Sequence, residues 1–362
     1  MKYDERELLI IWLDSFGEIE YIRKRALYEL LVGKTDLKKN LEHNRREIVA
    51  AVGEDGYNAL INSANQNYLK ETLASLEASG AAAITLQSEN YPELLKEIDD
   101  PPLALYCKGD RELFKSEIFG VVGSRKSLPL SLAAARDFSE ELVNGGFTLC
   151  TGTAEGVDSE VIKTALKKNA IISVSAGGIY NIYPAANSAL AEDVAKRGLL
   201  ISERREDIKP MPYMFPIRNR IIAGLSVGTL VVSGGLKSGT MYTAEYCLDY
   251  GRDLFAVPYS IGIASGAGCN ELIKRSAYLA DSPDDILSLY GKAVKKEEPP
   301  LSDIEREIIA AISEGAAHIE KIAAITEKQV YEITSALTVL EIKGLIYKTG
   351  INTYGLTRNR EI

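Results

Sequence analysis

The chain has 362 residues, 46% of them hydrophobic and 26% charged, with a formal net charge of −9 at pH 7. This composition is typical of a globular protein with room for two or three domains, and the acidic balance excludes a protein that coats nucleic acid through bulk positive charge. A local basic groove remains compatible with it, because moderate salt confines the field of a surface charge to about 10 Å. The acidic, amphipathic N-terminus does not resemble a signal sequence, and no apolar run approaches the roughly 20 residues of a membrane span.

The cysteines and histidines argue against metal chemistry. The four cysteines are far apart and form no CxxC pair, so we expect neither a disulfide framework nor a zinc site, and a reducing cytoplasm fits best. The two histidines, His43 and His318, lie outside polar clusters. We therefore expect no histidine-based acid–base or metal chemistry and no cofactor. The cysteines are Cys107, Cys150, Cys247 and Cys269.

Residues 1–75 predict a helical domain. The segments ERELLIIWLDSF, YIRKRALYELLV and HNRREIVAAVG carry the apolar spacing and turn signals of short helices. A bridging helix is predicted for NYLKETLASLEASG, residues 67–80. The next thirty or so residues alternate an apolar extended run with proline turns and lead into the main domain.

The pattern changes at Ile118, where short apolar runs begin to alternate with helix-like segments as far as DLFAVP, residues 253–258. Such alternation predicts right-handed βαβ units and a parallel sheet covered by helices on both faces. We assign this α/β domain to residues 76–291. Its glycine-rich turns follow strands and precede helices, so they collect at the carboxyl edge of the sheet, where open α/β sheets bind ligands.

The C-terminal part predicts a separate small domain. A charged linker with a proline pair spans residues 292–300, and three amphipathic helices followed by a short hairpin then predict a winged-helix-like domain over residues 301–362. The expected recognition helix, KQVYEITSALTVLEIKG, has few basic residues. We expect it to contact protein, or DNA only weakly.

Two turns have residues suited to anions. Gly123-Ser124-Arg125 directly follows IFGVV and combines backbone N–H groups, a hydroxyl and an arginine fork. It is neither GxGxxG nor a Walker A loop, so the usual signature of NAD or ATP binding is missing. The segment Gly234–Thr240 places a lysine and two hydroxyls among glycines before a helix, which favours an anion nest. For the first turn, an ordinary strand-to-helix turn with a surface arginine is an equal alternative.

Two further turns are ambiguous. In residues 151–158 small side chains let a ligand approach the backbone, but Asp158 is also a plausible helix cap. The turn with Gly177-Gly178 and Tyr183-Pro184 has the same two interpretations. The acids Glu155, Asp158, Glu203 and Glu245 form no recognisable metal cluster, and roles in loops and caps explain them as well as hydrolysis does.

The segment FPIRNRIIAGLS, residues 215–226, pairs two arginines with an apolar run. On a helix Arg218 and Arg220 point about 200° apart, so we expect them to differ in role. One is expected to reach a phosphate and the other to pin the loop to a carboxylate such as Glu203. Phe215 suits stacking on a base. The alternative is a capped helix start with incidental surface charges, and this stretch taken alone favours that interpretation.

Taken in order, these motifs resemble the DNA-processing protein A family (DprA, also called Smf). The upstream segment ITLQSENYPELLKEIDDPPLALYCKGD extends the likeness. The combination of GSR, FPxRNRIIAGLS and KSGT in this order is highly specific. The matching segments are GSR at 123–125, GTAEGVDSEVIKTAL at 152–166, GGIYNIYP at 177–184, LLISE at 199–203, FPIRNRIIAGLS at 215–226, KSGTMYTAE at 237–245, GRDLFAVP at 251–258 and GCNELI at 268–273.

The resemblance implies a Rossmann-like central domain that binds single-stranded DNA, protects it and loads the RecA recombinase onto it during natural transformation. It implies a cytoplasmic homodimer rather than an enzyme or a membrane protein, with a SAM-like N-terminal module and a winged helix that only some members have. Binding is expected to depend on salt and to be largely indifferent to sequence. The implied DNA-binding residues are Gly123, Ser124, Arg125, Phe215, Arg218, Asn219, Arg220, Lys237, Ser238 and Gly239.

The chain departs from the family pattern at three positions. The family usually has an arginine at Glu155, a histidine at Ile162 and a glutamate at Ser233. A negative charge at Glu155 weakens anion binding at that loop. The departures suggest a specialised member with a different partner.

Three other functions are compatible with parts of the sequence. The loop GGLKSGT with Glu245 is similar to the phosphate-binding loop of lysine-decarboxylase-like phosphoribohydrolases, which cleave nucleoside monophosphates; that family lacks RNR. A nucleotide or signal sensor that has lost DNA binding is suggested by Glu155. A sequence-specific regulator acting through the winged helix is the third, and the few basic residues of its recognition helix count against it.

Overall fold

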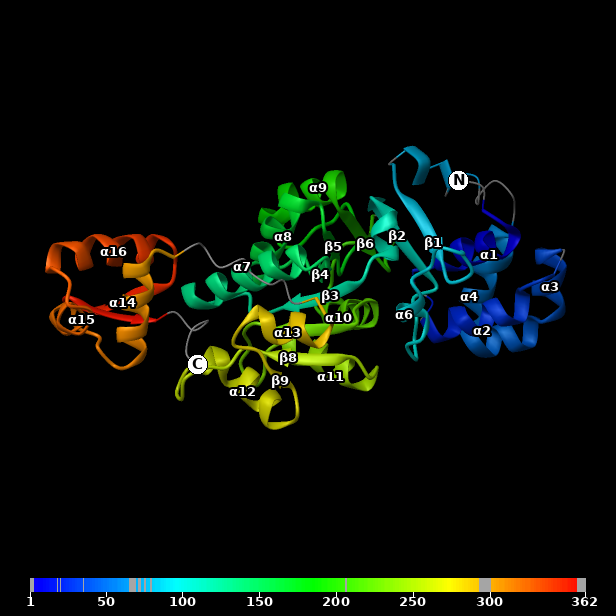
Figure 1. Ribbon diagram of the computed structural model, residues 1–362. Helices are drawn as coiled ribbons and strands as arrows, with labels where there is room; N and C mark the ends of the chain where they lie inside the picture. Colours follow the sequence, from blue (N-terminus) through cyan, green and yellow to red (C-terminus); the bar gives the residue numbers. More distant parts are fainter. Residues whose placement is uncertain are drawn as a thin grey trace. The chain divides into compact units, whose positions relative to one another are not determined.

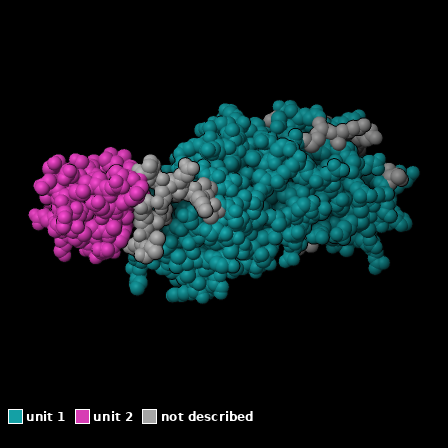
Figure 2. Space-filling view, in the orientation of Figure 1, with its two compact units in different colours: residues 1–294 teal, residues 295–362 magenta. Residues whose placement is uncertain are grey.

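The computed structural model divides the chain into two compact units, residues 1–294 and 295–362 (Figure 2). It describes residues 3–292 and 301–356, apart from residues 18, 20, 35, 65–69, 71–72, 75, 79 and 206. Much of the predicted bridging helix at residues 67–80 and nearly all of the predicted linker therefore lie outside the described residues.

The first unit begins with helices α1 (Glu5–Asp14), α2 (Tyr21–Leu31), α3 (Leu37–His43) and α4 (Arg45–Ser63). Asp4 starts α1 through a capping box with Glu7, which satisfies backbone N–H groups that the helix leaves open. The sequence did not predict α3 and ended the helix after it at Gly53. Gly53 does break the helical geometry, with φ 75°, but α4 continues beyond it to Ser63.

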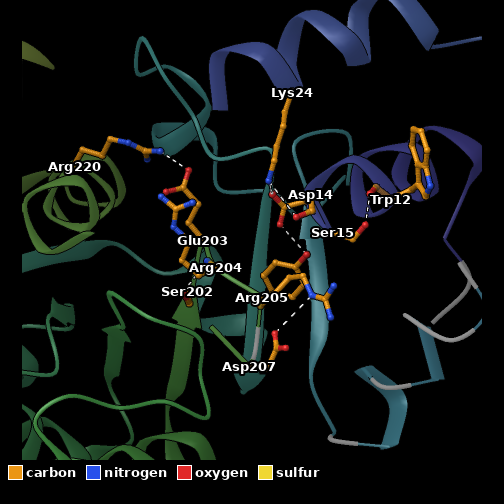
Figure 3. Close-up of polar contacts among 11 residues, drawn as sticks. Trp12, Asp14, Ser15, Lys24, Ser202, Glu203, Arg204, Arg205, Asp207 and Arg220 are labelled. Carbon is orange, nitrogen blue, oxygen red and sulfur yellow. Dashed lines mark hydrogen bonds and ion pairs between the residues drawn. The ribbon is translucent and has the colours of Figure 1, made fainter. Parts of the chain in front are cut away.

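These helices are attached to the sheet through a buried polar contact. Lys24, 4% exposed, donates to the Asp14 carboxylate over 3.0 Å, as Figure 3 shows. The hydroxyl of Tyr106 on strand β2 (Ala104–Gly109) donates to the other oxygen of the same carboxylate over 2.8 Å. Apolar residues of the N-terminal helices and of the sheet also share one core, and both parts belong to the first unit.

The described residues of this unit form a nine-stranded sheet in the order β1-β2-β6-β5-β4-β3-β7-β8-β9. Neighbours from β6 through β9 are parallel, which confirms the predicted Rossmann-like parallel sheet. Strands β1 and β2 extend it in antiparallel fashion beside β6, an addition that the sequence did not predict. The remaining strands are β1 (Ala82–Thr85), β3 (Ile118–Val122), β4 (Thr148–Thr151), β5 (Ile171–Val174), β6 (Leu199–Ser202), β7 (Gly228–Val231), β8 (Asp253–Ala256) and β9 (Tyr278–Leu279).

Helices cover both faces of the sheet (Figure 1). Successive residues of a strand point to opposite faces, so Phe119 and Val121 of β3 join one apolar core while Ile118 and Val122 join the other. The first core includes α7 (Pro129–Asn144), α8 (Val157–Ala165), α9 (Ser188–Arg197) and α13 (Pro283–Leu289). The second includes α6 (Glu93–Lys96), α10 (Met214–Leu225), α11 (Thr240–Asp249) and α12 (Ala267–Lys274).

The strand order reverses between β3 and β7. From β3 the chain proceeds outward through β4, β5 and β6, and then α10 carries it back across the sheet to β7 on the other side of β3. The loops that leave β3 and β7 therefore diverge, which opens a crevice at the carboxyl edge. Open α/β sheets bind their ligands at this kind of switch point.

The second unit has the three helices and the hairpin that the sequence predicts. These are α14 (Asp303–Ser313), α15 (Ile319–Thr326) and α16 (Val330–Ile342), followed by β10 (Ile346–Gly350) paired with β11 (Thr353–Leu356). The unit has an apolar core of its own. Among the described residues of both units, no helix is long and apolar enough to span a membrane.

Candidate nucleic-acid interface

A cavity of about 710 Å³ opens at the switch point, lined by the loops after β3 and β7 and by the start of α10. Arg220 and Lys237, both predicted site residues, do not line it. The cavity thus combines three sequence motifs that are far apart along the chain. The predicted residues that do line it are Gly123, Ser124, Arg125, Phe215, Arg218, Asn219, Ser238 and Gly239.

An arginine and two aromatic rings form one wall of the cavity. The Arg125 guanidinium carbon lies 4.8 Å from the centre of the Phe215 ring. The Tyr183 ring meets Phe215 edge-on, with 5.7 Å between centroids and 70° between planes. Arg125 and Tyr183 are both exposed to solvent. The wall therefore offers a cation for phosphate and ring surfaces for a planar group.

Two hydrogen bonds hold the turn that carries Arg125. The Ser124 N–H donates to the Ser233 hydroxyl over 3.2 Å, and the Ser127 hydroxyl donates to the Ser124 carbonyl over 2.7 Å. Ser233 is fully buried. Ser233 and Ser127 thus engage the Ser124 backbone, and the charged residues of this turn that line the cavity are Arg125 and Lys126.

The loop after β4 packs directly under the same turn. Gly156 has φ 79°, and a Cβ there would collide with the Ser124 and Arg125 carbonyl oxygens, so the position requires glycine. Glu155, which precedes it, is exposed. This places the negative charge of Glu155 next in sequence to the residue that touches the Arg125 backbone.

Arg218 and Asp158 lie near each other at the floor of the cavity, and each is 6% exposed. Arg218 Nη1 donates a hydrogen bond to the Val174 carbonyl at the end of β5. The Asp158 carboxylate accepts one from the Ala154 N–H over 3.2 Å. A side chain at Gly152 would collide with both charged groups, which shows how closely they approach. Asp158 is the second residue of α8 rather than its cap, a position that Gly156 occupies.

Burial opposes ionisation of this pair. It raises the pKa of the Asp158 carboxyl, an effect that the nearby Arg218 charge partly offsets. Burial likewise lowers the pKa of Arg218, while Asp158 acts in the opposite direction and Arg125 adds to the lowering. Arg125 and Arg218 both line the cavity, so a bound anion would reduce the repulsion between their positive charges.

Arg220 points away from the cavity. It is 2% exposed, pairs with Glu203 beyond β6 as Figure 3 shows, and contacts the Asp100 carboxylate over 2.8 Å. The expected pinning of one arginine to Glu203 is confirmed. Of the two arginines, Arg218 faces the cavity and Arg220 joins α10 to the strand edge.

The loop after β7 supplies hydroxyls. Ser238 and Thr240 share a hydrogen bond of 3.0 Å between their side chains at the start of α11, and both line the cavity. The Asn219 amide donates to the Gly239 carbonyl over 3.1 Å, which ties this loop to α10. Lys237 is exposed at the tip of the loop, outside the cavity lining.

The acids considered for hydrolysis and the cysteines lie mostly outside the cavity. Of the four acids considered for hydrolysis, Asp158 alone lines the cavity. Within the described residues no group of three His, Cys, Asp or Glu side chains is arranged to hold a metal ion. All four cysteines are buried and unpaired, and burial raises the pKa of Cys247 and Cys269 to about 12.

Several residues that line the cavity were not predicted as site residues. Lys126, Tyr183, Pro210 and Pro212 contribute to the cavity, but only Tyr183 was noted, as part of an ambiguous turn. The signal that was available is an aromatic or proline-rich loop placed just before FPIRNR.

Cations, hydroxyls and rings at the switch point of a Rossmann-like sheet define a binding protein for ligands that combine phosphate with a planar group.

Comparison with known proteins gives the family. The model for DNA recombination-mediator protein A matches residues 82–291, and the DprA winged helix domain matches residues 293–348. The chain is 38% identical to DNA processing protein DprA of Bacillus subtilis over 246 residues, covering 67% of this chain and 83% of that one. It is 34% identical to Protein Smf of Escherichia coli over 292 residues, covering 77% and 78%. The chain belongs to the DprA/Smf family, and the winged-helix assignment is confirmed.

Two solved structures agree with this assignment. DNA processing protein A from Streptococcus pneumoniae superposes with a TM-score of 0.61 at 28% identity, covering 72% of this chain and 96% of that one. DNA processing protein A from Helicobacter pylori, whose structure is described by its single-stranded DNA binding mode, gives a TM-score of 0.54 at 28% identity, covering 59% and 96%.

Proposed function

We propose that this protein binds single-stranded DNA, protects it and loads RecA onto it during natural transformation. The observation that carries the proposal is the switch-point cavity with Arg125 over Phe215 and Tyr183 beside it. Membership of the DprA/Smf family supports it. So does the single-stranded DNA binding of the relative from Helicobacter pylori.

The predicted site residues take three roles in this proposal. Gly123, Ser124, Arg125, Phe215, Lys237, Ser238 and Gly239 contact the strand, with the cations on phosphates and the ring on a base. Arg218 and Asn219 build the floor and its link to the β7 loop. Arg220 acts from outside the cavity by holding α10 in place. Ring stacking and phosphate contacts do not read base edges, so binding tolerates any sequence.

Fluorescence anisotropy with a labelled dT25 strand and a labelled 25-base-pair duplex, each at two salt concentrations, tests DNA binding. We expect the single strand to bind more tightly than the duplex and to weaken as salt rises, because phosphate neutralisation releases counterions. Failure of the folded protein to retain dT25 even at low salt would rule out the proposed function. Equally tight binding of the duplex would contradict an interface that is specific for an unstacked single strand.

RecA loading needs its own assay. We expect the protein to shorten the lag of RecA filament formation on single-stranded DNA that is coated with single-strand-binding protein. An Arg125→Ala variant should lengthen the lag again, since it holds the strand more weakly. If the protein binds DNA but does not shorten the lag, the RecA-loading part of the proposal is wrong and the DNA-binding part remains. We also propose that the protein is a cytoplasmic homodimer. Light scattering of the full chain tests the dimer.

A second candidate is a nucleotide-binding protein or a nucleoside-monophosphate phosphoribohydrolase. The cavity favours it in one respect, since Ser238, Thr240 and the buried Asp158 line a volume of about 710 Å³ at the start of a helix. Incubation with nucleoside monophosphates and chromatography for a released base separates the two. We propose that the protein is not an enzyme and expect no free base; its release would support the phosphoribohydrolase.

A further inference from the structure

Beside the cavity, five apolar side chains are exposed on three loops of the carboxyl edge. Leu236 is 61% exposed on the loop after β7, and Ile261 is fully exposed on the loop after β8. Leu128 and Leu130, at the start of α7, are also exposed, as is Ile263. Exposed apolar residues cost free energy when they gather, so a gathered set marks a binding surface. We call Leu128, Leu130, Leu236, Ile261 and Ile263 the apolar lip.

Hydrogen bonds hold these three loops together. The Ser131 and Tyr259 hydroxyls are 2.8 Å apart, which joins the start of α7 to the loop after β8. The Gly234 N–H donates to the Ser265 carbonyl over 2.8 Å, which joins the loops after β7 and β8. The apolar lip is therefore presented by a connected scaffold rather than by independent loops.

The apolar lip continues from the cavity. Leu128 follows Lys126 by two residues, and Leu236 precedes Ser238 by two residues; both of these polar residues line the cavity. Both leucines therefore lie next to residues of the cavity lining, one on each of the loops after β3 and β7.

Charge favours a polyanion at this surface. Asp and Glu make up 51 of the 362 residues, yet the segments 123–136, 232–244 and 254–270 contain none. The same segments expose Lys126 and Lys237 next to the leucines. A protein partner would also cover an apolar patch, but it would not require that these segments lack acids and carry lysines beside the leucines.

We propose that the apolar lip packs against the bases of the single strand where the strand leaves the cavity, with Lys126 and Lys237 on its phosphates. This rests on the proposed single-stranded DNA binding and extends it from the cavity to the following nucleotides. The faces of unstacked bases are apolar, and aliphatic side chains pack on them as they do when they wedge between base steps.

The test compares two labelled 12-mers, one of dT throughout and one in which only the four central thymidines keep their bases and the rest are abasic. Both have the same phosphates, so only base contacts differ. The variant is Leu236→Ser/Ile261→Ser, both on exposed loop positions. The matched control is Leu289→Ser, a half-exposed leucine on α13 that does not line the cavity.

We expect the double variant to bind dT12 about tenfold more weakly, the low end of what one base contact contributes. The abasic 12-mer should bind the wild type and both variants alike, and Leu289→Ser should match wild type throughout. Equal loss on both strands would overturn the proposal, because the lip would then act through the fold or the phosphates. No loss on either strand would overturn it as well and leave a protein partner as the occupant. If wild type binds neither strand, the proposed function fails too.

Discussion

Arg125 covers the face of Phe215, with 4.8 Å from the guanidinium carbon to the ring centre. The two residues are far apart along the chain, one in the turn after β3 and the other in the first turn of α10. Phe215 also contacts Tyr183, so the three side chains together form one wall of the cavity. A phosphate and a base can therefore be held side by side, which is what a nucleotide in a single strand requires.

Arg125→Ala should weaken binding of dT25 at least tenfold, because it removes both a phosphate contact and the cation beside the ring. Arg125→Lys keeps the charge but loses the planar stack, so we expect an intermediate affinity with an unchanged salt dependence. Anisotropy at several salt concentrations measures both. The matched control is Arg136→Ala on α7, an arginine that pairs with Glu160 at 2.8 Å. Equal losses for Arg125→Ala and Arg136→Ala would contradict a specific role for the wall.

Glu155→Arg should strengthen DNA binding. The exposed carboxylate adjoins Gly156, which packs on the Arg125 backbone, so it repels phosphates at the mouth of the cavity. Exchanging it for a cation adds about one phosphate contact, which steepens the slope of log affinity against log salt by about 0.7 for a single strand. Glu192→Arg on α9 makes the same change in net charge away from the cavity. If both variants strengthen binding equally, the gain reflects overall charge and not this loop.

Arg220→Ala should destabilise the first unit without altering the cavity lining. Removing one partner of a buried ion pair leaves the Glu203 carboxylate without that cation. We expect a loss of about 3 kcal/mol in the free energy of unfolding. For a unit of this size that lowers the melting temperature by roughly 6–12 °C. Arg197→Ala, which breaks an exposed pair with Asp193, should cost less than about 1 kcal/mol. Thermal unfolding compares them, and similar small losses would show that Arg220 does not hold α10.

The second unit should lose stability in acid through Glu305. The Lys343 ammonium and the Ser302 N–H hold the pKa of this carboxyl below its usual range. Its contribution is therefore complete above the unfolded pKa of about 4.3 and is lost as pH falls through the lower folded value. Amide hydrogen exchange in α14 and α16, corrected for intrinsic rates, should show this loss. Glu305→Gln should already be less protected at pH 7 and respond less to acid; an identical response would exclude Glu305 as its source.

Much of the fold could be predicted because alternation of apolar runs and helices is a local signal. The parallel strands from β3 onward and the three helices with a hairpin in the second unit were predicted from it. The antiparallel addition of β1 and β2 was not predicted, because strand direction depends on partners far along the chain. Helix α3 was missed, since a seven-residue helix has too few apolar positions to show a period.

The candidate site was predicted less completely. Residues with a chemical signature in a motif, such as Arg125 and Ser238, were selected, and the structure brings them together. The separation of Arg218 from Arg220 followed from helix geometry, whereas only the fold decides which of them faces the cavity. Tyr183 gave no comparable signal, because a tyrosine before a proline reads as an ordinary turn until Phe215 lies beside it.

Photo-crosslinking tests the central claim most directly. A strand of dT12 with 5-iodouracil at its centre is bound to the full chain, irradiated and digested, and mass spectrometry identifies the linked residues. The wall predicts adducts on Phe215 or Tyr183, which disappear with excess unlabelled dT25 and become scarce in Arg125→Ala. Adducts confined to the winged-helix unit, or to the face of the sheet away from the switch point, would contradict a strand held in this cavity.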